Sequence, residues 1–146
     1  MEQLIKKIEN YYNLNIKEII KNEESTDGNV YIIITNNNRV IMKIYDDLNH
    51  VKSIIKLHNY ISNNMNIPNI IKTKNSKDYK KYNNKYLVLF TFLEGEKVKE
   101  YIGNNEIIKR IAKEIRKLHD LTEGRNTFNL KKVPFRINSN LKRNTI

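Results

Sequence analysis

Residues 30–45 read VYIIITNNNRVIMKIY, and this stretch decides the class of fold. The runs over 30–35 and 39–45 are rich in β-branched and aromatic residues, which favour strands. Between them, Asn36, Asn37 and Asn38 are typical turn residues. The stretch therefore predicts an antiparallel β-hairpin.

Periodic apolar residues predict a helix on each side of this hairpin. The first dozen residues have apolar side chains at helical spacing. Asp46 and Asp47 can cap a second helix, which should end before Pro68. The residues expected on the buried face of this second helix are Val51, Ile54, Ile55, His58 and Ile61.

A third and longer helix is expected from about Asn105 to about Leu121. Its apolar residues fall on one stripe, and Gly124 suits its C-terminal end. The stripe is made up of Ile108, Ile111, Ala112, Ile115, Leu118 and His119.

Two further segments have strand character. Residues 86–92 are apolar almost throughout, as expected of a central strand that is covered on both faces. A short strand is expected near residues 69–73, whereas the polar, lysine-rich residues 75–84 predict an exposed connection. The sequence thus predicts an α+β fold: an antiparallel sheet with one embedded helix, a link at Gly95 and a final helix.

The composition excludes several classes of protein. A chain of 146 residues has room for one domain, and the lack of cysteine excludes disulfides, thiolate nucleophiles and cysteine zinc sites. No apolar run reaches the roughly 18 residues that a membrane span needs. The N-terminal residues do not form a secretory signal. We therefore expect a cytoplasmic protein without a membrane partner.

The formal net charge of +11 is unevenly distributed. Residues 1–124 contain 21 basic and 16 acidic side chains, whereas residues 125–146 contain six basic side chains and no acidic one. The sequence has 24 Asn, 23 Ile and 21 Lys but one Ala, which are residues of A/T-rich codons, so part of the lysine surplus reflects base composition. Because the basic tail offers only Phe128 and Phe135 for stacking on bases, we do not expect nucleic acid as the partner.

The polar turn before the hairpin is the first candidate site. It reads ESTDGNVY over residues 24–31, and its glycine, Gly28, allows a ligand to approach the backbone closely. Backbone N–H groups and hydroxyls in such a turn can bind phosphate oxygens, and Lys43 on the returning strand would add charge attraction. Taken alone, the same pattern is that of an ordinary turn with a solvated lysine.

The end of the apolar strand is the second candidate site. It reads Phe92-Leu93-Glu94-Gly95. An extended link after a buried strand exposes N–H and C=O groups, which can pair with the edge of a purine ring. An ordinary loop is the alternative interpretation.

In their order, these segments resemble a known family. The polar turn, the hairpin with Lys43, the helix, Ile67-Pro68, the apolar strand, residues 92–96 and a helix ending in Lys117-Leu118-His119 are similar to the N-terminal part of the aminoglycoside phosphotransferase and choline kinase family. That family has a protein-kinase-like fold. The resemblance extends from about residue 10 to about residue 123, and it rests on the ordered set rather than on one specific motif.

The resemblance implies an ATP-binding lobe. Residues 25–29 would cover the phosphates, and Lys43 would contact the α and β phosphates. Phe90 would lie behind the adenine, while Glu94 and Gly95 would form the hinge to a second lobe. Ile32, Ile41 and Phe92 are the implied walls of the adenine pocket. The implied nucleotide-binding residues are Ser25, Thr26, Gly28, Asn29, Lys43, Phe90, and the backbone of Thr91 and Leu93.

Two departures from the family pattern concern catalysis. No glutamate occurs between Asp47 and Met65 to pair with the strand lysine, and Lys52 or Ser53 stands about where one is expected. Either Asp46 or Asp47 takes over that role after a shift, or the phosphate site is imperfect. The H-G-D-x-x-x-x-N and I-D segments that supply the catalytic Asp and the magnesium ligands are also absent from this sequence. His119-Asp120-Leu121 followed by Asn126 is one residue short of a catalytic loop and overlaps a helix end.

The resemblance therefore implies an N-terminal fragment of an ATP-dependent small-molecule phosphotransferase, nearly inactive by itself, with Mg²⁺ expected only with a missing C-terminal lobe. We assign residues 1–94 to a nucleotide-binding lobe, 95–124 to a hinge and the first helix of the second lobe, and 125–146 to a basic tail. The acceptor would be a hydroxyl of an aminoglycoside, choline or homoserine. The alternatives are a stand-alone, non-catalytic binding module and a basic nucleic-acid-binding protein.

Overall fold

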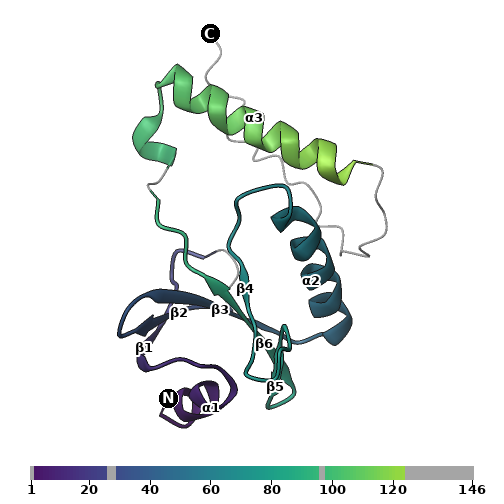
Figure 1. Ribbon diagram of the computed structural model, residues 1–146. Helices are drawn as coiled ribbons and strands as arrows, with labels where there is room; N and C mark the ends of the chain where they lie inside the picture. Colours follow the sequence, from purple (N-terminus) through teal and green to yellow (C-terminus); the bar gives the residue numbers. More distant parts are fainter. Residues whose placement is uncertain (1, 26–28, 96–97, 124–146) are drawn as a thin grey trace, which may run out of the picture.

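In the computed structural model, which describes residues 2–25, 29–95 and 98–123, an antiparallel sheet carries helices on both faces (Figure 1). The described strands form a six-stranded sheet in the order β1-β2-β3-β6-β4, and β5 also pairs with β6. Every described strand pair is antiparallel. The elements are α1 (Glu2–Tyr11), β1 (Ile16–Lys21), β2 (Val30–Thr35), β3 (Arg39–Tyr45), α2 (Leu48–Ser62), β4 (Ile70–Ile71), β5 (Lys80–Tyr82), β6 (Lys85–Thr91), a 3-10 turn (Val98–Tyr101) and α3 (Asn105–Thr122).

The predicted hairpin and its turn are confirmed as β2 and β3. Val30 lies opposite Lys43, and Ile32 lies opposite Ile41. In the turn, the Thr35 hydroxyl and the Thr35 N–H both donate to the Asn38 carbonyl, each at 2.9 Å. The hairpin thus has one register, which fixes the side chains that share a face.

The predicted helix after Asp47 is confirmed as α2. The Asp47 carboxylate accepts the Asn49 N–H at 2.9 Å, which is the geometry of an N-cap. Its buried side chains are Val51, Ile55 and Ile61, while Ile54 and His58 are half-buried.

The two faces of the sheet bury different clusters. One face packs against α1, and its cluster is Ile8, Tyr12, Ile19, Ile33, Val40, Met42, Leu87 and Leu89. The other face packs against α2, and its buried members are Val51, Ile55, Val88 and Phe90, with Ile41 and Tyr45 partly buried beside them. Residues 87–90 of β6 are all buried, so the prediction of a central strand covered on both faces is confirmed.

Three strand predictions need correction. β1 was not predicted, because Lys17 and Glu18 are exposed on an edge strand and hide its alternation. The segment 75–84, expected to be a connection, contains β5, which joins β6 through a two-residue turn. In that turn Asn83 and Asn84 both have positive φ angles, 46° and 59°, as a type I′ hairpin turn requires. β4 is shorter than the strand expected over 69–73.

The third predicted helix is confirmed as α3, but its apolar stripe is not buried in the described structure. No residue of α3 is buried, and Ile108 and Ile115 are 46% and 50% exposed. His119, which we expected on this apolar stripe, is also exposed. Figure 1 shows α3 on the side of the sheet opposite to α1. Among the described residues, neither α3 nor any other helix has the length and apolar character to cross a membrane.

Tyr12 is the one large core side chain with a polar atom left unpaired in the described part of the chain. Its side chain is fully buried in the α1 cluster, and its hydroxyl has no hydrogen-bond partner there. Burial raises the pKa of Tyr12, and the charge of Asp78 adds to the shift. The protonated form is therefore favoured in the folded state.

Replacing Tyr12 with Phe should stabilise the protein by about 1 kcal/mol, because it removes a buried hydroxyl without a partner. Urea denaturation at pH 7 measures this change, with Tyr11→Phe as the control for a half-buried neighbour. A Tyr12→Phe variant less stable than the wild type at pH 7 would show that the hydroxyl contributes a bond.

The same variant should also change the pH dependence of stability. The folded-state pKa of Tyr12 lies above the unfolded value of about 10. Because only the unfolded chain loses the Tyr12 proton just above pH 10, the free energy of unfolding of the wild type should fall above that pH and be unaffected by this group below it. The loss should approach about 1.4 kcal/mol per pH unit. The free energy of unfolding, measured by urea denaturation between pH 9 and 11, should therefore fall less steeply with pH for Tyr12→Phe than for the wild type. The same pH dependence in both proteins would contradict the role of Tyr12.

Candidate functional site

Lys43 lies on the sheet face that α2 partly covers. It shares this face with Ile41 and Tyr45, because alternate residues of a strand point to the same side. Its neighbours on the adjacent strands are Val30 of β2 and Val88 of β6, which are 5% and 0% exposed. The half-buried Lys43 side chain thus leaves the sheet between two buried valines.

An apolar row crosses the same face next to Lys43. Ile20, Ile32, Ile41 and Phe90 are successive cross-strand partners on β1, β2, β3 and β6. Phe90 is buried beside α2, Ile32 and Ile41 are half-buried, and Ile20 is 42% exposed. Ile41 and Lys43 are two residues apart, or about 7 Å along the strand. The face therefore offers an apolar surface with a cation at one side.

The backbone at the end of β6 is fixed to the segment before β4. The Thr91 N–H donates to the Asn69 carbonyl at 2.8 Å, and the Asn69 N–H donates to the Thr91 hydroxyl at 2.8 Å. In the described residues, no backbone hydrogen bond involves the N–H of Leu93, which follows in the extended link. The link thus presents an unpaired donor directly after the apolar strand.

His58 of α2 connects three parts of this region. Its Nε2–H donates to the Pro68 carbonyl, directly before Asn69. Its ring also contacts the Phe90 ring at a centroid distance of 5.1 Å. The helix, the β4 approach and the end of β6 are thereby held together at Phe90.

Arg39 and Glu94 form an ion pair at the other side of the link. Arg39 Nη2 lies 2.6 Å from Oε1 and 2.5 Å from Oε2 of Glu94. The guanidinium also lies over the Phe92 ring, 4.1 Å from its centroid. Phe92, which we expected to be a pocket wall, is therefore covered by Arg39 on the side of this stacking contact.

The predicted phosphate-covering loop lies only partly among the described residues. Thr26 and Gly28 fall outside them. The Ser25 N–H donates to the Asn22 carbonyl at 3.2 Å, and the Asn29 carbonyl accepts the Ile44 N–H at 3.0 Å. The Asn29 end of the loop is thus anchored to β3 next to Lys43, whereas the Ser25 end is bonded to Asn22, which follows β1.

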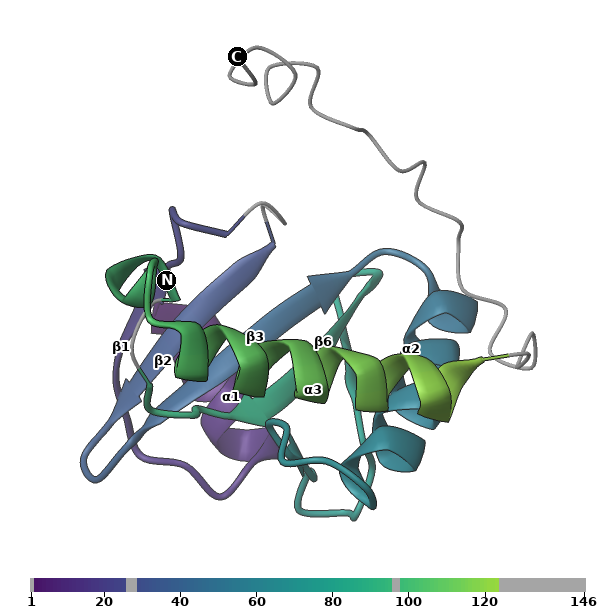
Figure 2. The same ribbon diagram turned by 90° about the horizontal axis from the view of Figure 1, so that it is seen from above.

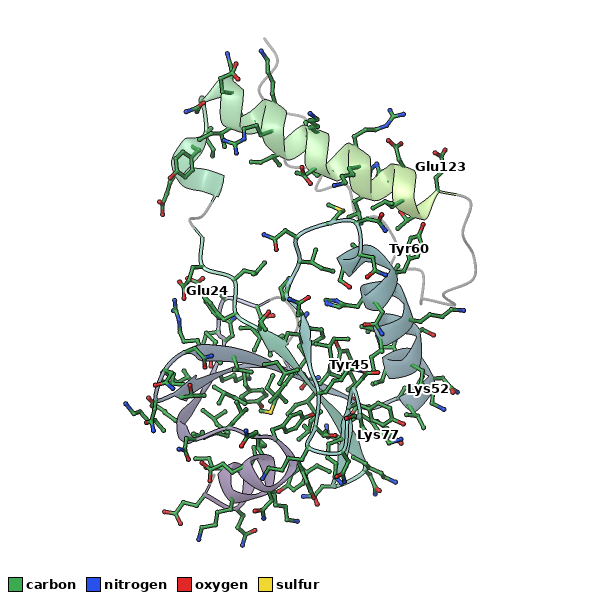
Figure 3. All side chains as sticks on the ribbon, in the orientation of Figure 1. Glu24, Tyr45, Lys52, Tyr60, Lys77 and Glu123 are labelled. Atoms are coloured by element: carbon green, nitrogen blue, oxygen red, sulfur yellow. The ribbon has the colours of Figure 1, made fainter. Side chains whose placement is uncertain are left out.

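The expected acidic partner of Lys43 does not occur in α2. The helix contains no Asp or Glu, and Lys52 is exposed and points away from the sheet (Figure 3). Asp46 pairs with Lys85 at 3.0 Å, and Asp47 caps α2, so neither replaces the missing glutamate. Within the described ranges, no hydrogen bond or ion pair involves the Lys43 ammonium.

The structure brings together Lys43, Ile32, Ile41 and Phe90 on one face, with Thr91 and Leu93 at its edge. Sequence reasoning missed Ile20, Val30 and Arg39. Val30 and Arg39 could have been found from the predicted hairpin, because they share the alternation of Ile32 and Lys43. Ile20 could not, since β1 was not predicted. The residues described include no group of three or more His, Asp or Glu side chains placed to bind a metal ion.

Comparison with solved structures identifies the fold. No protein-family model matches the sequence, and no curated protein matches it. The structure of a microcompartment-associated aminopropanol kinase superposes with a TM-score of 0.52 and 11% identity, covering 68% of this chain and 34% of that one.

Two phosphotransferases give lower scores. A spectinomycin phosphotransferase in complex with ADP and spectinomycin has a TM-score of 0.49 and 19% identity over 65% of this chain and 30% of that one. An aminoglycoside phosphotransferase from Alicyclobacillus acidocaldarius has a TM-score of 0.46 and 14% identity over 59% of this chain and 26% of that one.

The chain spans about a third of the length of the aminopropanol kinase and less of the other two. The similarity to the aminopropanol kinase confirms the predicted resemblance at the level of the fold. The described residues form a kinase-like fold.

Proposed function

We propose that this chain is the nucleotide-binding lobe of an ATP-dependent small-molecule phosphotransferase. One observation carries the proposal: Lys43, without a protein counter-ion in the described residues, stands beside an apolar row whose last member, Phe90, lies three residues before Leu93. In the same residues the Leu93 N–H has no backbone partner. The sheet thus offers, one after another along its strands, a cation for phosphate, an apolar surface for a base and a backbone donor for the base edge.

The residues fit an adenine nucleotide in three respects. Ile32 and Ile41 offer an apolar surface to a planar base, and Phe90 closes its inner end. The Leu93 N–H supplies a hydrogen bond to the base edge, for which the Thr91 carbonyl is the expected second partner. Lys43 would bind the phosphates, and residues 25–29 would cover them. ATP, when bound, supplies the phosphoryl group that is transferred.

The transfer step needs residues that this sequence does not contain. An Asp that orients the acceptor hydroxyl, and the Asn and Asp ligands of Mg²⁺, belong to H-x-D-x-x-x-x-N and I-D segments. We infer that residues 1–94 form the nucleotide lobe, that 95–124 contain the hinge and the first helix of a second lobe, and that such a lobe brings the acceptor. The acceptor class is a small molecule with a free hydroxyl, such as an aminoglycoside, choline or homoserine.

Replacing Lys43 with Met should weaken ADP binding about 10- to 100-fold, since a hydrogen bond to a charged group contributes about 1.5–3 kcal/mol. Met is an unbranched side chain only one atom shorter than Lys, and it removes the ammonium group that would bind the phosphates. Isothermal titration calorimetry with the 146-residue chain measures the effect. Lys52→Met is the matched control, because Lys52 is exposed on the outer side of α2, and it should bind ADP like the wild type.

Equal ADP affinities of the Lys43→Met and wild-type proteins would contradict the assignment of Lys43. A wild type that binds no nucleotide, but binds nucleic acid with an affinity that falls steeply with salt and depends on residues 125–146, would favour the basic nucleic-acid binder instead.

The gene itself offers a second test. If the chain belongs to a phosphotransferase, the reading frame downstream, allowing one frameshift, should encode H-x-D-x-x-x-x-N within about 100 residues. Nucleotide sequencing of this region checks the expectation. A downstream sequence without that segment would favour the stand-alone, non-catalytic binding module.

A further inference from the structure

We propose that Arg39 is a positioning residue, which fixes the link after β6 so that its backbone can receive the base of the nucleotide. The inference rests on the proposed function, and it concerns the base end of the site only. The observation behind it is that one guanidinium contacts both an aromatic ring and a carboxylate of the link.

The sheet register brings Arg39 to the link. Val40 lies opposite Thr91, so the next pair in the same register is Arg39 with Phe92. The Arg39 guanidinium lies 4.1 Å from the Phe92 ring centroid, so these two side chains meet just beyond the last ladder residue of β6. Arg39 also shares the face of Ile41 and Lys43 by alternation, so it lies at the end of the candidate site.

In the described range 91–94, every residue except Leu93 is held by an interaction outside the link. Thr91 is held by two hydrogen bonds to Asn69 on one side. Phe92 and Glu94 are held by Arg39 on the other. Fixing residues 91, 92 and 94 restricts the direction of the intervening Leu93 N–H, which has no backbone partner of its own in this part of the structure.

Stability of the fold does not explain the arrangement. The Arg39 and Glu94 side chains are 45% and 76% exposed, and exposed ion pairs contribute little to stability. What the pair adds is orientation, because the planar guanidinium stacks and donates at the same time, whereas a lysine ammonium has no such plane. The order of the link before binding lowers the entropy cost of recognising a base.

The test separates the base end of the site from the phosphate end. Calorimetry measures the Kd of ADP and of inorganic tripolyphosphate for the wild type, Arg39→Ala, Arg39→Lys, Glu94→Gln and Lys43→Met. Arg39→Ala should weaken the binding of ADP about five- to tenfold and leave the binding of tripolyphosphate unchanged. The ADP affinity of Arg39→Lys should lie between those of the wild type and Arg39→Ala. Glu94→Gln should weaken ADP binding less than Arg39→Ala does, because the stacking of Arg39 on Phe92 remains. Lys43→Met should weaken the binding of both ADP and tripolyphosphate.

Arg116→Ala is the control, since Arg116 forms a comparable exposed pair with Asp120 within α3. Thermal unfolding of each variant checks that it is folded. If Arg39→Ala does not fold, Glu94→Gln still tests the inference, because the Glu94 side chain is 76% exposed. Unchanged ADP affinity in Arg39→Ala and Glu94→Gln overturns the inference but leaves the proposed function intact. An equal loss for ADP and tripolyphosphate also overturns it, because Arg39 would then act on the phosphates. A wild type that binds neither ligand overturns the proposed function itself.

Discussion

The antiparallel pairing of β3 with β6 is the constraint on which the rest of the structure depends. It places Val88 beside Lys43 and Phe90 beside Ile41, so the charged and apolar parts of the candidate site lie on one face. The same strands bury Met42 and Leu89 on the opposite face, against α1. A shift of one residue in this register would exchange the two faces and move Lys43 into the core. Figure 2 shows α3 crossing this region in the view from above.

The sequence predicted the hairpin, α1, α2, α3 and the apolar strand, because each has a strong local signal: alternation, helical periodicity or a continuous apolar run. It missed β1, since an edge strand with Lys17 and Glu18 exposed has a weak pattern. It also missed β5, although Asn83 and Asn84 are typical of a tight hairpin turn. Burial of the α3 stripe was not predictable from periodicity, which identifies an apolar face and not what covers it.

For the site, the resemblance to the phosphotransferase family was enough to predict that Lys43, Ile41 and Phe90 share one region. The contacts of Arg39 could not be predicted, because the pair with Glu94 joins residues 55 positions apart and depends on the register beyond the end of β6. The lack of an acidic residue on α2 was visible in the sequence, whereas the partners of Asp46 and Asp47 needed coordinates. Local patterns thus give the elements, and long-range pairing assembles the site.

The central claim is that the sheet face with Lys43 and the apolar row binds a nucleotide. An NMR titration of the ¹⁵N-labelled chain with ADP tests it most directly, since it reports which amides sense the ligand. The account predicts that the amide signals of Ile32, Ile41, Lys43 and Leu93 shift in a saturable way, while those of α1 stay in place. Saturable shifts centred on α1 or β5, or no shifts at millimolar ADP, would contradict it.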